Sequence, residues 1–280
     1  SGRHSPHFAS LTAMTSPAQH QPITFVGGGN MGSALVGGLI AAGWPATSIT
    51  IVELSADRRN ALATLFPGVV TSAEIGPCSA GVIAVKPPLA AQTCAQLAQA
   101  GAKRVLSIAA GISVATLQEA AGSGTAVVRA MPNTPALVGE GAAGICVSAQ
   151  CTEDDLVWAE SILGAVGTVV RIDEQLIDAL TAISGSGPAY VFLFAEAMIA
   201  AAVAEGLSPE IAQALTRQLL VGSAKLLQQS DETPEQLRLN VTSPNGVTAA
   251  AIASLEGAGF REIIRAAVKA AISRSKEMGA

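Results

Sequence analysis

Residues 23–32 have the sequence ITFVGGGNMG, a short apolar run followed at once by closely spaced glycines. Gly27, Gly29 and Gly32 have the spacing G-x-G-x-x-G, and a helix-like stretch from about 31 to 42 follows them. In the dinucleotide-binding fingerprint the first glycine permits a tight turn, the second admits a pyrophosphate and the third lets helix and strand pack closely. The alternative is a tight strand–helix turn without a ligand. The favoured interpretation is a pyrophosphate site formed by Gly27, Gly28, Gly29, Asn30, Met31 and Gly32.

An acidic residue near the end of the next apolar run supports this interpretation. Glu53 closes the run 49–54, where the adenosine ribose of a dinucleotide would lie. Its carboxylate can accept hydrogen bonds from a ribose 2′-hydroxyl, which favours NAD. Arg58 and Arg59 follow and can pair with a 2′-phosphate, which favours NADP, or can form a solvated helix face. The sequence therefore leaves NADH and NADPH open.

Strand-like runs and helix-length segments alternate up to about residue 173. The predicted strands cover 23–26, 49–54, 81–85, 104–108, 126–130, 144–148 and 168–172, and the helices between them cover 31–42, 57–65, 89–100, 113–121 and 152–166. This alternation indicates βαβ units and a parallel sheet. We therefore expect an α/β fold, an N-terminal Rossmann doubly wound sheet within residues 21–174.

Beyond that point the strand signals stop. Helices are predicted over 174–182, 188–205 and 260–276 and after the caps Ser208 and Thr233, with a break at 184–188. The segment 188–205 is apolar almost all round, so it must be buried, and another subunit is the expected cover. Residues 175–280 are accordingly predicted to form an all-α C-terminal dimerisation and substrate-binding domain.

Composition narrows the class of protein. Half of the 280 residues are hydrophobic, 3% are aromatic and the formal net charge is -5, which argues against a nucleic-acid partner. The sequence contains no run of 18 or more apolar residues, so it predicts no membrane span. The cysteines Cys78, Cys94, Cys146 and Cys151 form no CxxC pair, so we expect reduced thiols and a cytoplasmic protein.

The polar N-terminal stretch is excluded from the predicted fold. Residues 1–20 are a disordered tail or cloning remnant in this interpretation, and Met14 is a candidate natural start. All three histidines, His4, His7 and His20, lie inside it. The folded body therefore has no imidazole for a Ser-His-Asp triad, a general base or a metal site, and no metal is expected.

Segments at predicted strand ends form a second group of candidates. Ala84, Val85, Lys86 and Pro87 follow one strand, Ala109, Ala110 and Gly111 follow another, and Asn133 lies between two prolines after a third. Because the carboxyl ends of parallel strands share one edge, these residues can form a flat wall against a nicotinamide ring. Lys86 can bind a ribose or phosphate or simply be exposed, and Asn133 can make a fixed contact or stiffen a turn.

The most informative segment of the helical part is the turn 243–248. Pro244, Asn245 and Gly246 require a turn, and a helix follows directly. Free backbone N–H groups of Gly246, Val247 and Thr248 would then lie beside the hydroxyls of Ser243 and Thr248, which suits a small carboxylate. An ordinary capped interhelical turn is the alternative.

The motifs together resemble the pyrroline-5-carboxylate reductase family. VGGGNMG, AVKP, RAMPNTP, SGSGPAY and VTSPNGVT appear in family order, and the resemblance extends from Ile23 over the rest of the chain. It implies NADPH or NADH as cofactor and a homodimer, often assembled into a larger ring, with sites between subunits. It further implies cofactor contacts at Gly27–Gly32, Ala84–Pro87, Ala109–Gly111 and Asn133, a substrate site at Ser243, Asn245, Gly246 and Val247, and a ring-nitrogen contact by the catalytic Thr248.

Two positions depart from the family pattern. Family members commonly have glycine at the position of Asn245 and threonine or alanine at that of Val247. Asparagine tolerates left-handed backbone better than most residues, so the turn can survive. Val247 would contribute only its backbone.

The expected reaction needs no strong protein acid. A cyclic imine can take its proton from solvent, so the protein has to position the C=N carbon against the nicotinamide, anchor the carboxylate and exclude water. The alternatives are a Rossmann dehydrogenase of another small imino or hydroxy acid and a non-catalytic dinucleotide-binding dimer. The former usually needs a lysine or histidine acid/base, which the turn motifs do not supply.

Overall fold

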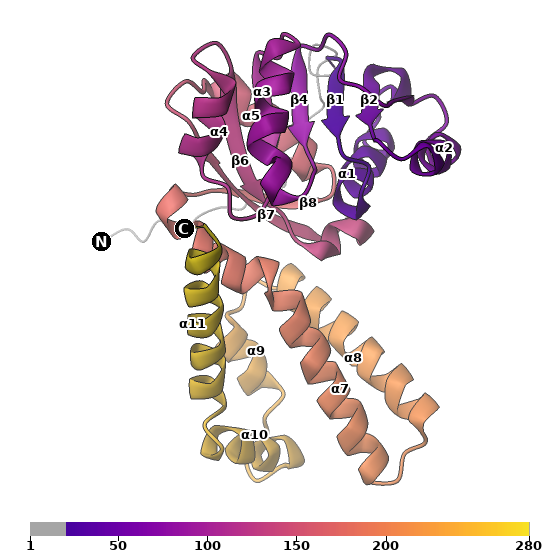
Figure 1. The fold of residues 1–280 in the computed structure, drawn as a ribbon. Helices are drawn as coiled ribbons and strands as arrows, with labels where there is room; N and C mark the ends of the chain where they lie inside the picture. Colours follow the sequence, from indigo (N-terminus) through magenta and orange to yellow (C-terminus); the bar gives the residue numbers. More distant parts are fainter. Residues whose placement is uncertain (1–20, 280) are drawn as a thin grey trace.

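The computed structural model describes residues 21–279, so the predicted tail with its three histidines lies outside the described residues. Figure 1 shows two parts, a twisted sheet with helices on both faces and, below it, a helical part with two arms. One arm is a helical hairpin, and the other carries the C-terminal helices back to the sheet. The predicted architecture, an α/β Rossmann sheet followed by helices alone, is confirmed.

The sheet has the strand order of a dinucleotide-binding fold. Its eight strands have the order β3-β2-β1-β4-β5-β6-β7-β8. They are β1 (Ile23–Val26), β2 (Ile49–Val52), β3 (Val70–Ser72), β4 (Ala80–Ile83), β5 (Arg104–Ser107), β6 (Ala126–Met131), β7 (Gly141–Val147) and β8 (Gly167–Arg171). Strand β1 pairs in parallel with both β2 and β4, so the chain order reverses there. Ligands of such sheets bind outside the carboxyl ends of the strands at this switch point.

Two features of the sheet differ from the sequence prediction. Strand β3 was not predicted, because it has only three residues at the edge of the sheet. Strand β7 is antiparallel to β6, although a parallel sheet was predicted. The link between them consists mainly of a 3-10 turn, Thr134–Val138, which is too short for the crossover that a parallel pair requires.

Helices cover both faces and complete two cores. Helices α1 (Asn30–Ala41), α2 (Ala56–Leu65) and α5 (Glu153–Gly164) pack on one face through residues such as Leu39, Leu62 and Ile162. Helices α3 (Ala90–Gln99) and α4 (Val114–Ala121) pack on the other through Leu97 and Leu117. This rigid frame fixes the strand ends at which the candidate cofactor residues lie.

The helical part begins with one long stretch, Glu174–Ala204. A 3-10 turn (Glu174–Leu176), α6 (Ile177–Leu180), a π-helical turn (Thr181–Gly185) and α7 (Gly187–Ala204) make it up. The break predicted at 184–188 corresponds to a bend at Ser186, between the π-helical turn and α7, where the Ser186 N–H donates to the Thr181 carbonyl at 2.8 Å. Pro188 is tolerated because it lies in the first turn of α7.

The other helices are α8 (Pro209–Gln229), α9 (Pro234–Asn240), α10 (Val247–Gly257) and α11 (Phe260–Gly279). Serine and threonine caps begin two of them: the Ser208 hydroxyl accepts from the Ile211 N–H, and the Thr233 hydroxyl accepts from the Gln236 N–H. In Figure 1, α7 and α8 form one arm, and α9, α10 and α11 form the other.

Polar contacts join the two parts. The Arg129 guanidinium on β6 bonds to Glu174 at 2.7 Å, and the same carboxylate oxygen accepts from the Val114 N–H at the start of α4. At the other end of the helical part, the Ser275 hydroxyl donates to Asp178 at 2.6 Å. The first segment of the helical part is therefore anchored to the sheet part through Glu174, and the last helix is held to that first segment.

Helix α7 is apolar but has no buried residue. Within residues 21–279, Glu174–Ala204 is also the one helical stretch long and apolar enough to cross a membrane, with a mean hydropathy of 1.7. One such helix is weak evidence for a span, because a helix at a subunit interface has the same composition. The predicted burial of this helix is therefore not found within a single chain.

Candidate functional site

The glycine turn after β1 has the steric properties that the fingerprint requires. Gly27 has a φ of +107°, and a Cβ there would lie 2.4 Å from the Ala84 carbonyl oxygen. A Cβ on Gly32 would lie 2.5 Å from the Gly27 oxygen, whereas one on Gly29 would meet nothing within 4 Å. The predicted roles of Gly27 in the turn and of Gly32 in close packing are confirmed. The open space at Gly29 is where a pyrophosphate can approach.

The amino end of α1 adds an anion-binding character to this turn. The helix begins at Asn30, and its cap residue Gly29 provides no side-chain hydrogen bond. The first N–H groups of a helix have no intrahelical acceptor and carry a partial positive charge. Asn30 and Met31 therefore present donors at the end of β1, in the position at which a phosphate is bound in this type of fold.

Glu53 lies directly after β2 and points toward the glycine turn. Its carboxylate accepts the Gly28 N–H at 3.1 Å through one oxygen and the Ser55 N–H at 3.1 Å through the other. The side chain is therefore held by two backbone donors from different loops. Its negative charge is therefore fixed beside the glycine turn, and its contact with a ribose stays a prediction.

The two arginines on α2 do not form a solvated helix face, so that alternative is wrong. Arg58 donates to the Gly28 carbonyl at 2.8 Å and to the Ser33 hydroxyl at 3.1 Å. Arg59 donates to the backbone carbonyls of Glu53 at 2.7 Å and Leu54 at 2.8 Å. Both guanidinium groups thus brace the loops around the acidic residue.

The predicted nicotinamide wall follows the neighbouring strands β4 and β5. These strands pair in parallel, so the segments Ala84–Pro87 and Ala109–Gly111 leave the sheet at the same edge. Lys86 is exposed and precedes the 3-10 turn Pro87–Leu89. Gly111 has a φ of +76°, and a Cβ there would lie 3.4 Å from the Met278 carbonyl oxygen, so the end of α11 supports this loop.

Asn133 is buried and makes the fixed side-chain contacts that its position predicts. Its amide nitrogen donates to the Ser184 carbonyl at 3.0 Å, and its amide oxygen accepts the Ala142 N–H at 2.8 Å. These partners are protein backbone, one in the π-helical turn and one in β7. Asn133 therefore orients the junction of the two parts, and its place beside a nicotinamide stays a prediction.

The turn before α10 has the predicted shape with one difference. Asn245 has a φ of 59°, the left-handed conformation that asparagine tolerates. The Gly246 N–H donates to the Ser243 carbonyl at 3.0 Å, so the prediction that this N–H is free is wrong. The donors of Val247 and Thr248 begin the helix and have no intrahelical acceptor. The side chain of Val247 is 90% exposed.

A single chain does not bring the two predicted half-sites together. The glycine turn and the wall lie at the strand ends of the sheet, whereas α10 and the turn before it lie at the far end of the helical part (Figure 1). Helix α10, which contains Thr248, is therefore distant from the strand ends predicted to hold the cofactor.

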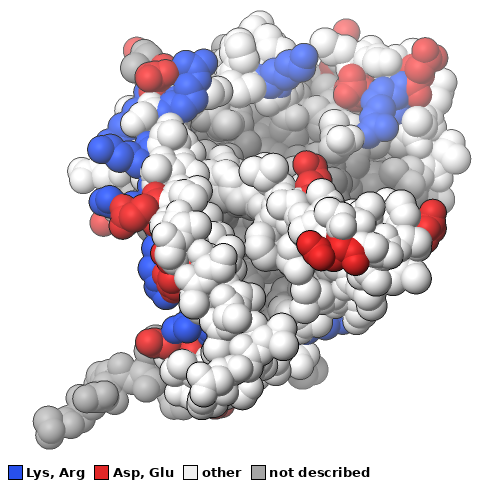
Figure 2. Space-filling view, turned by 90° about the horizontal axis from the view of Figure 1, so that it is seen from below, with Lys and Arg blue, Asp and Glu red and all other residues white. Residues whose placement is uncertain are grey.

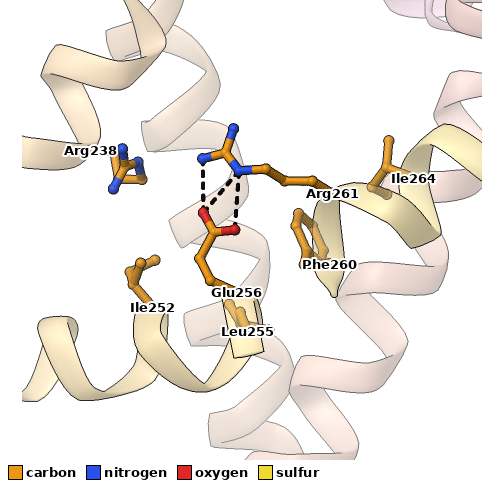
Figure 3. Close-up of a pocket in the computed structure, with 7 residues that line it drawn as sticks. All are labelled: Arg238, Ile252, Leu255, Glu256, Phe260, Arg261 and Ile264. Atoms are coloured by element: carbon orange, nitrogen blue, oxygen red, sulfur yellow. Dashed lines mark hydrogen bonds and ion pairs between the residues drawn. The ribbon is translucent and has the colours of Figure 1, made fainter. Parts of the chain in front are cut away.

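An apolar cavity of about 390 Å³ opens between α9, α10 and α11 and was not predicted from the sequence. Figure 3 shows Glu256 facing Arg261, with their closest atoms 2.8 Å apart, and apolar side chains around them. The lining residues are Arg238, Ile252, Leu255, Glu256, Phe260, Arg261 and Ile264. None of them is a predicted site residue.

The cysteines are free, and burial keeps two of them unreactive. Desolvation raises the pKa of the Cys94 thiol to about 11, and burial next to Glu174 raises the pKa of Cys146 to about 11. The thiolate is the reactive form, so these thiols are poor nucleophiles and ligands at neutral pH. Among residues 21–279, no group of three or more His, Cys, Asp or Glu residues could hold a metal ion.

Family models match both parts of the chain. The model described as pyrroline-5-carboxylate reductase dimerisation matches residues 174–278, and that described as NADP oxidoreductase coenzyme F420-dependent matches residues 22–111. A pyrroline-5-carboxylate reductase of Pseudomonas aeruginosa is 42% identical, covering 91% of this chain and 96% of its own. One of Haemophilus influenzae is 40% identical, covering 93% and 98%.

Solved structures give the same result. A pyrroline-5-carboxylate reductase of Coxiella burnetii has a TM-score of 0.88 and 37% identity, covering 93% of this chain and 99% of its own. The pyrroline carboxylate reductase of Plasmodium falciparum, solved with NADP bound, has a TM-score of 0.80 and 34% identity, covering 94% and 99%. Fold and sequence are therefore similar over nearly the whole length.

Proposed function

This chain belongs to the pyrroline-5-carboxylate reductase family, and we propose that it reduces 1-pyrroline-5-carboxylate to L-proline in a site shared by two copies. A nicotinamide dinucleotide, NADH or NADPH, supplies the hydride to the C=N bond. The observation that supports a shared site is the position of the turn at 243–248, which leads into α10 at the far end of the helical part, away from the strand ends of its own sheet (Figure 1).

Residues 21–174 bind the dinucleotide in this proposal. The open backbone at Gly29 and the unpaired donors of Asn30 and Met31 receive the pyrophosphate. Glu53 contacts the adenosine ribose, while Ala84–Pro87 and Ala109–Gly111 form the wall behind the nicotinamide. Asn133 acts as a positioning residue, because its amide already joins β7 to the π-helical turn.

Residues 175–280 bind the substrate and dimerise. The N–H groups of Val247 and Thr248 anchor the substrate carboxylate, with Ser243, Asn245 and Gly246 shaping the turn. The Thr248 hydroxyl makes no hydrogen bond within residues 21–279, so it is available to the ring nitrogen of the substrate. The iminium proton comes from solvent, and the site contributes orientation and exclusion of water.

A homodimer explains the exposed apolar surface. Helix α7 has Phe192 62% exposed and Leu193 66% exposed, and the cavity of Figure 3 is lined mainly by apolar side chains. Figure 2, viewed from the helical end, shows broad uncharged areas between the charged groups. Such a surface is typical of an obligate interface. We further propose that dimers can assemble into rings, as the family resemblance implies.

A dimer of this kind also accounts for the apolar helix without a membrane. The partner covers Glu174–Ala204, and the protein is cytoplasmic, in keeping with four free cysteines. The net charge of -5 argues against a nucleic-acid partner.

Oxidation of NADH or NADPH in the presence of 1-pyrroline-5-carboxylate tests the activity directly. Thr248→Val should lower kcat/KM by about 10- to 100-fold, the equivalent of roughly 1–3 kcal/mol for one buried hydrogen bond. Unchanged kcat/KM in this variant would remove Thr248 from the mechanism. A wild-type protein that binds the dinucleotide without turnover would leave a non-catalytic dimer as the function.

Complementation tests the shared site. Gly29→Asp places a charge where the pyrophosphate approaches, and Thr248→Val removes the hydroxyl of the turn. Heterodimers of the two variants, purified through two different tags, contain one site with both changes and one site with neither. We expect them to recover about half of the wild-type activity, far above either variant alone. Activity no higher than that of the variants would show that each site lies within one chain.

A further inference from the structure

The adenosine end of the cofactor site combines a fixed carboxylate with two arginines that are already engaged. We propose that Glu53 makes this enzyme select NADH over NADPH, a specificity that rests on the proposed use of a nicotinamide dinucleotide. Glu53 begins the loop after β2, beside the first glycine turn, where the 2′ position of an adenosine ribose lies in this type of fold.

The position of the carboxylate is set by the backbone. The Gly28 N–H donates to one carboxylate oxygen and the Ser55 N–H to the other, each at 3.1 Å. These donors belong to the two loops that border the ribose position. The carboxylate can turn away only by breaking charge-assisted hydrogen bonds, so its charge remains at the site when a cofactor binds.

The neighbouring arginines are oriented toward the protein. Arg58 bonds to the Gly28 carbonyl at 2.8 Å and the Ser33 hydroxyl at 3.1 Å, which directs its guanidinium toward the glycine turn and α1. Arg59 bonds to the carbonyls of Glu53 and Leu54. These contacts use Nε and Nη2 of Arg58 and Nη1 of Arg59, so a 2′-phosphate would have to share the two guanidinium groups with the backbone and hydroxyl acceptors that they already bind. Their observed contacts instead stabilise the loops that hold the carboxylate.

The two cofactors therefore interact with this site differently. The 2′-hydroxyl of NADH can donate a hydrogen bond to a fixed carboxylate. The 2′-phosphate of NADPH has about two negative charges at neutral pH, and it would face the carboxylate at short range. The relative from Plasmodium falciparum was solved with NADP, so this preference is a property proposed for this chain.

Equilibrium binding of NADH and NADPH, followed by cofactor fluorescence, tests the proposal without any turnover. We expect wild-type protein to bind NADH at least about 10-fold more tightly than NADPH, and Glu53→Gln to narrow that ratio at least about 5-fold by improving NADPH binding. Asp57→Asn is the matched control, because it removes the same charge from an exposed position on the first turn of α2 and should leave the ratio unchanged.

Two results would overturn the proposal. One is equal or tighter binding of NADPH by the wild-type protein, which would make the arginines the dominant contact. The other is a Glu53→Gln variant that binds NADH and NADPH more weakly by the same factor, which would indicate that Glu53 has only a structural role. The wild-type ratio decides the question even if the variant fails to fold. A protein that binds NADH more tightly than NADPH but does not reduce pyrroline-5-carboxylate would refute the proposed reaction. The proposed cofactor selectivity would still hold.

Discussion

The sheet part and the helical part of this molecule differ in how much of their apolar surface is buried within one chain. Strands and helices up to Ala182 contribute nearly all of the buried residues, with side chains such as Phe25, Leu39 and Leu106 fully enclosed. From residue 183 to 279, only Ala212 and Thr216 are buried. The sheet part thus has a hydrophobic core of its own. The helical part is also rich in apolar residues, but their side chains are exposed to solvent in a single chain.

This difference teaches which contacts stabilise each part. Burial of apolar area is the main favourable term in folding, so the sheet part can be stable in one chain. Helices α7 and α8 can stabilise the folded state to a similar extent only when a second copy of the chain buries their apolar surface. Dimerisation, folding of the helical part and completion of the active site are therefore expected to be linked.

The largest effect is expected from a charge placed on α7. Phe192→Asp, at a side chain that is 62% exposed in one chain, should dissociate the dimer, since an unpaired charge in an apolar interface costs several kcal/mol. We expect reductase activity to fall by about 1,000-fold or more, the result of roughly 4 kcal/mol lost in association. Light scattering gives the mass of the particle, and cofactor fluorescence shows whether the sheet part still binds the dinucleotide.

Leu65→Asp is the control for that variant, because Leu65 is 60% exposed at the end of α2 on the sheet part. It should change neither the mass nor the activity. If Phe192→Asp remained dimeric and active, the exposed face of α7 would not be the interface. If it lost cofactor binding as well, the sheet part would depend on the partner and the contrast between the two parts would fail.

A smaller effect is expected from a pair of glycines within the sheet part. Gly27→Ala should lower the free energy of unfolding of this part by about 2–4 kcal/mol, because the residue has a positive φ and its Cβ would collide with the Ala84 carbonyl. Gly29→Ala meets no atom within 4 Å and should change stability by less than about 0.5 kcal/mol. Denaturant unfolding of each variant gives both values.

The pair separates the scaffold from the binding surface. Gly29→Ala should still weaken binding of the dinucleotide, because its methyl group occupies the space in which the pyrophosphate is expected to bind. Equal stability of the two variants would mean that the turn rearranges freely. The decrease in the free energy of unfolding caused by Gly27→Ala should also be measured when Phe192→Asp has dissociated the dimer, because the turn belongs to the sheet part.

Local patterns predicted the sheet part well. The fingerprint at Gly27–Gly32 predicted strand, turn and helix correctly, because Gly27 needs a positive φ and Gly32 packs against the Gly27 oxygen, both within this short segment. The antiparallel direction of β7 could not be predicted from apolar runs, which are the same in either direction. The contacts of Glu53 with Gly28 and of Arg58 with Gly28 join separate loops, so no spacing in the sequence gives them.

The helical part shows a different limit of prediction. The apolar composition of 188–205 correctly indicated a surface that needs a cover, but no pattern shows which surface of a second chain provides it. The break predicted at 184–188 was located correctly, but the π-helical turn that precedes the bend at Ser186 could not be predicted from the residues of this segment. For the turn 243–248, the sequence predicted the conformation of Asn245 and missed the use of the Gly246 N–H within the turn.

The smallest effect is expected at Asn245, the one residue other than glycine with a positive φ between residues 21 and 279. Asn245→Gly removes the steric cost of the left-handed conformation but adds flexibility to the unfolded chain, so stability should change by less than about 0.5 kcal/mol. Asn245→Ala should cost about 1 kcal/mol, because alanine lacks the local hydrogen bonding that helps asparagine adopt this conformation. Thermal unfolding of the dimer measures both. Because the turn lies in the part that depends on the partner, the difference between the two variants should disappear in the Phe192→Asp background. A difference that persisted there would mean that the turn folds without a second copy.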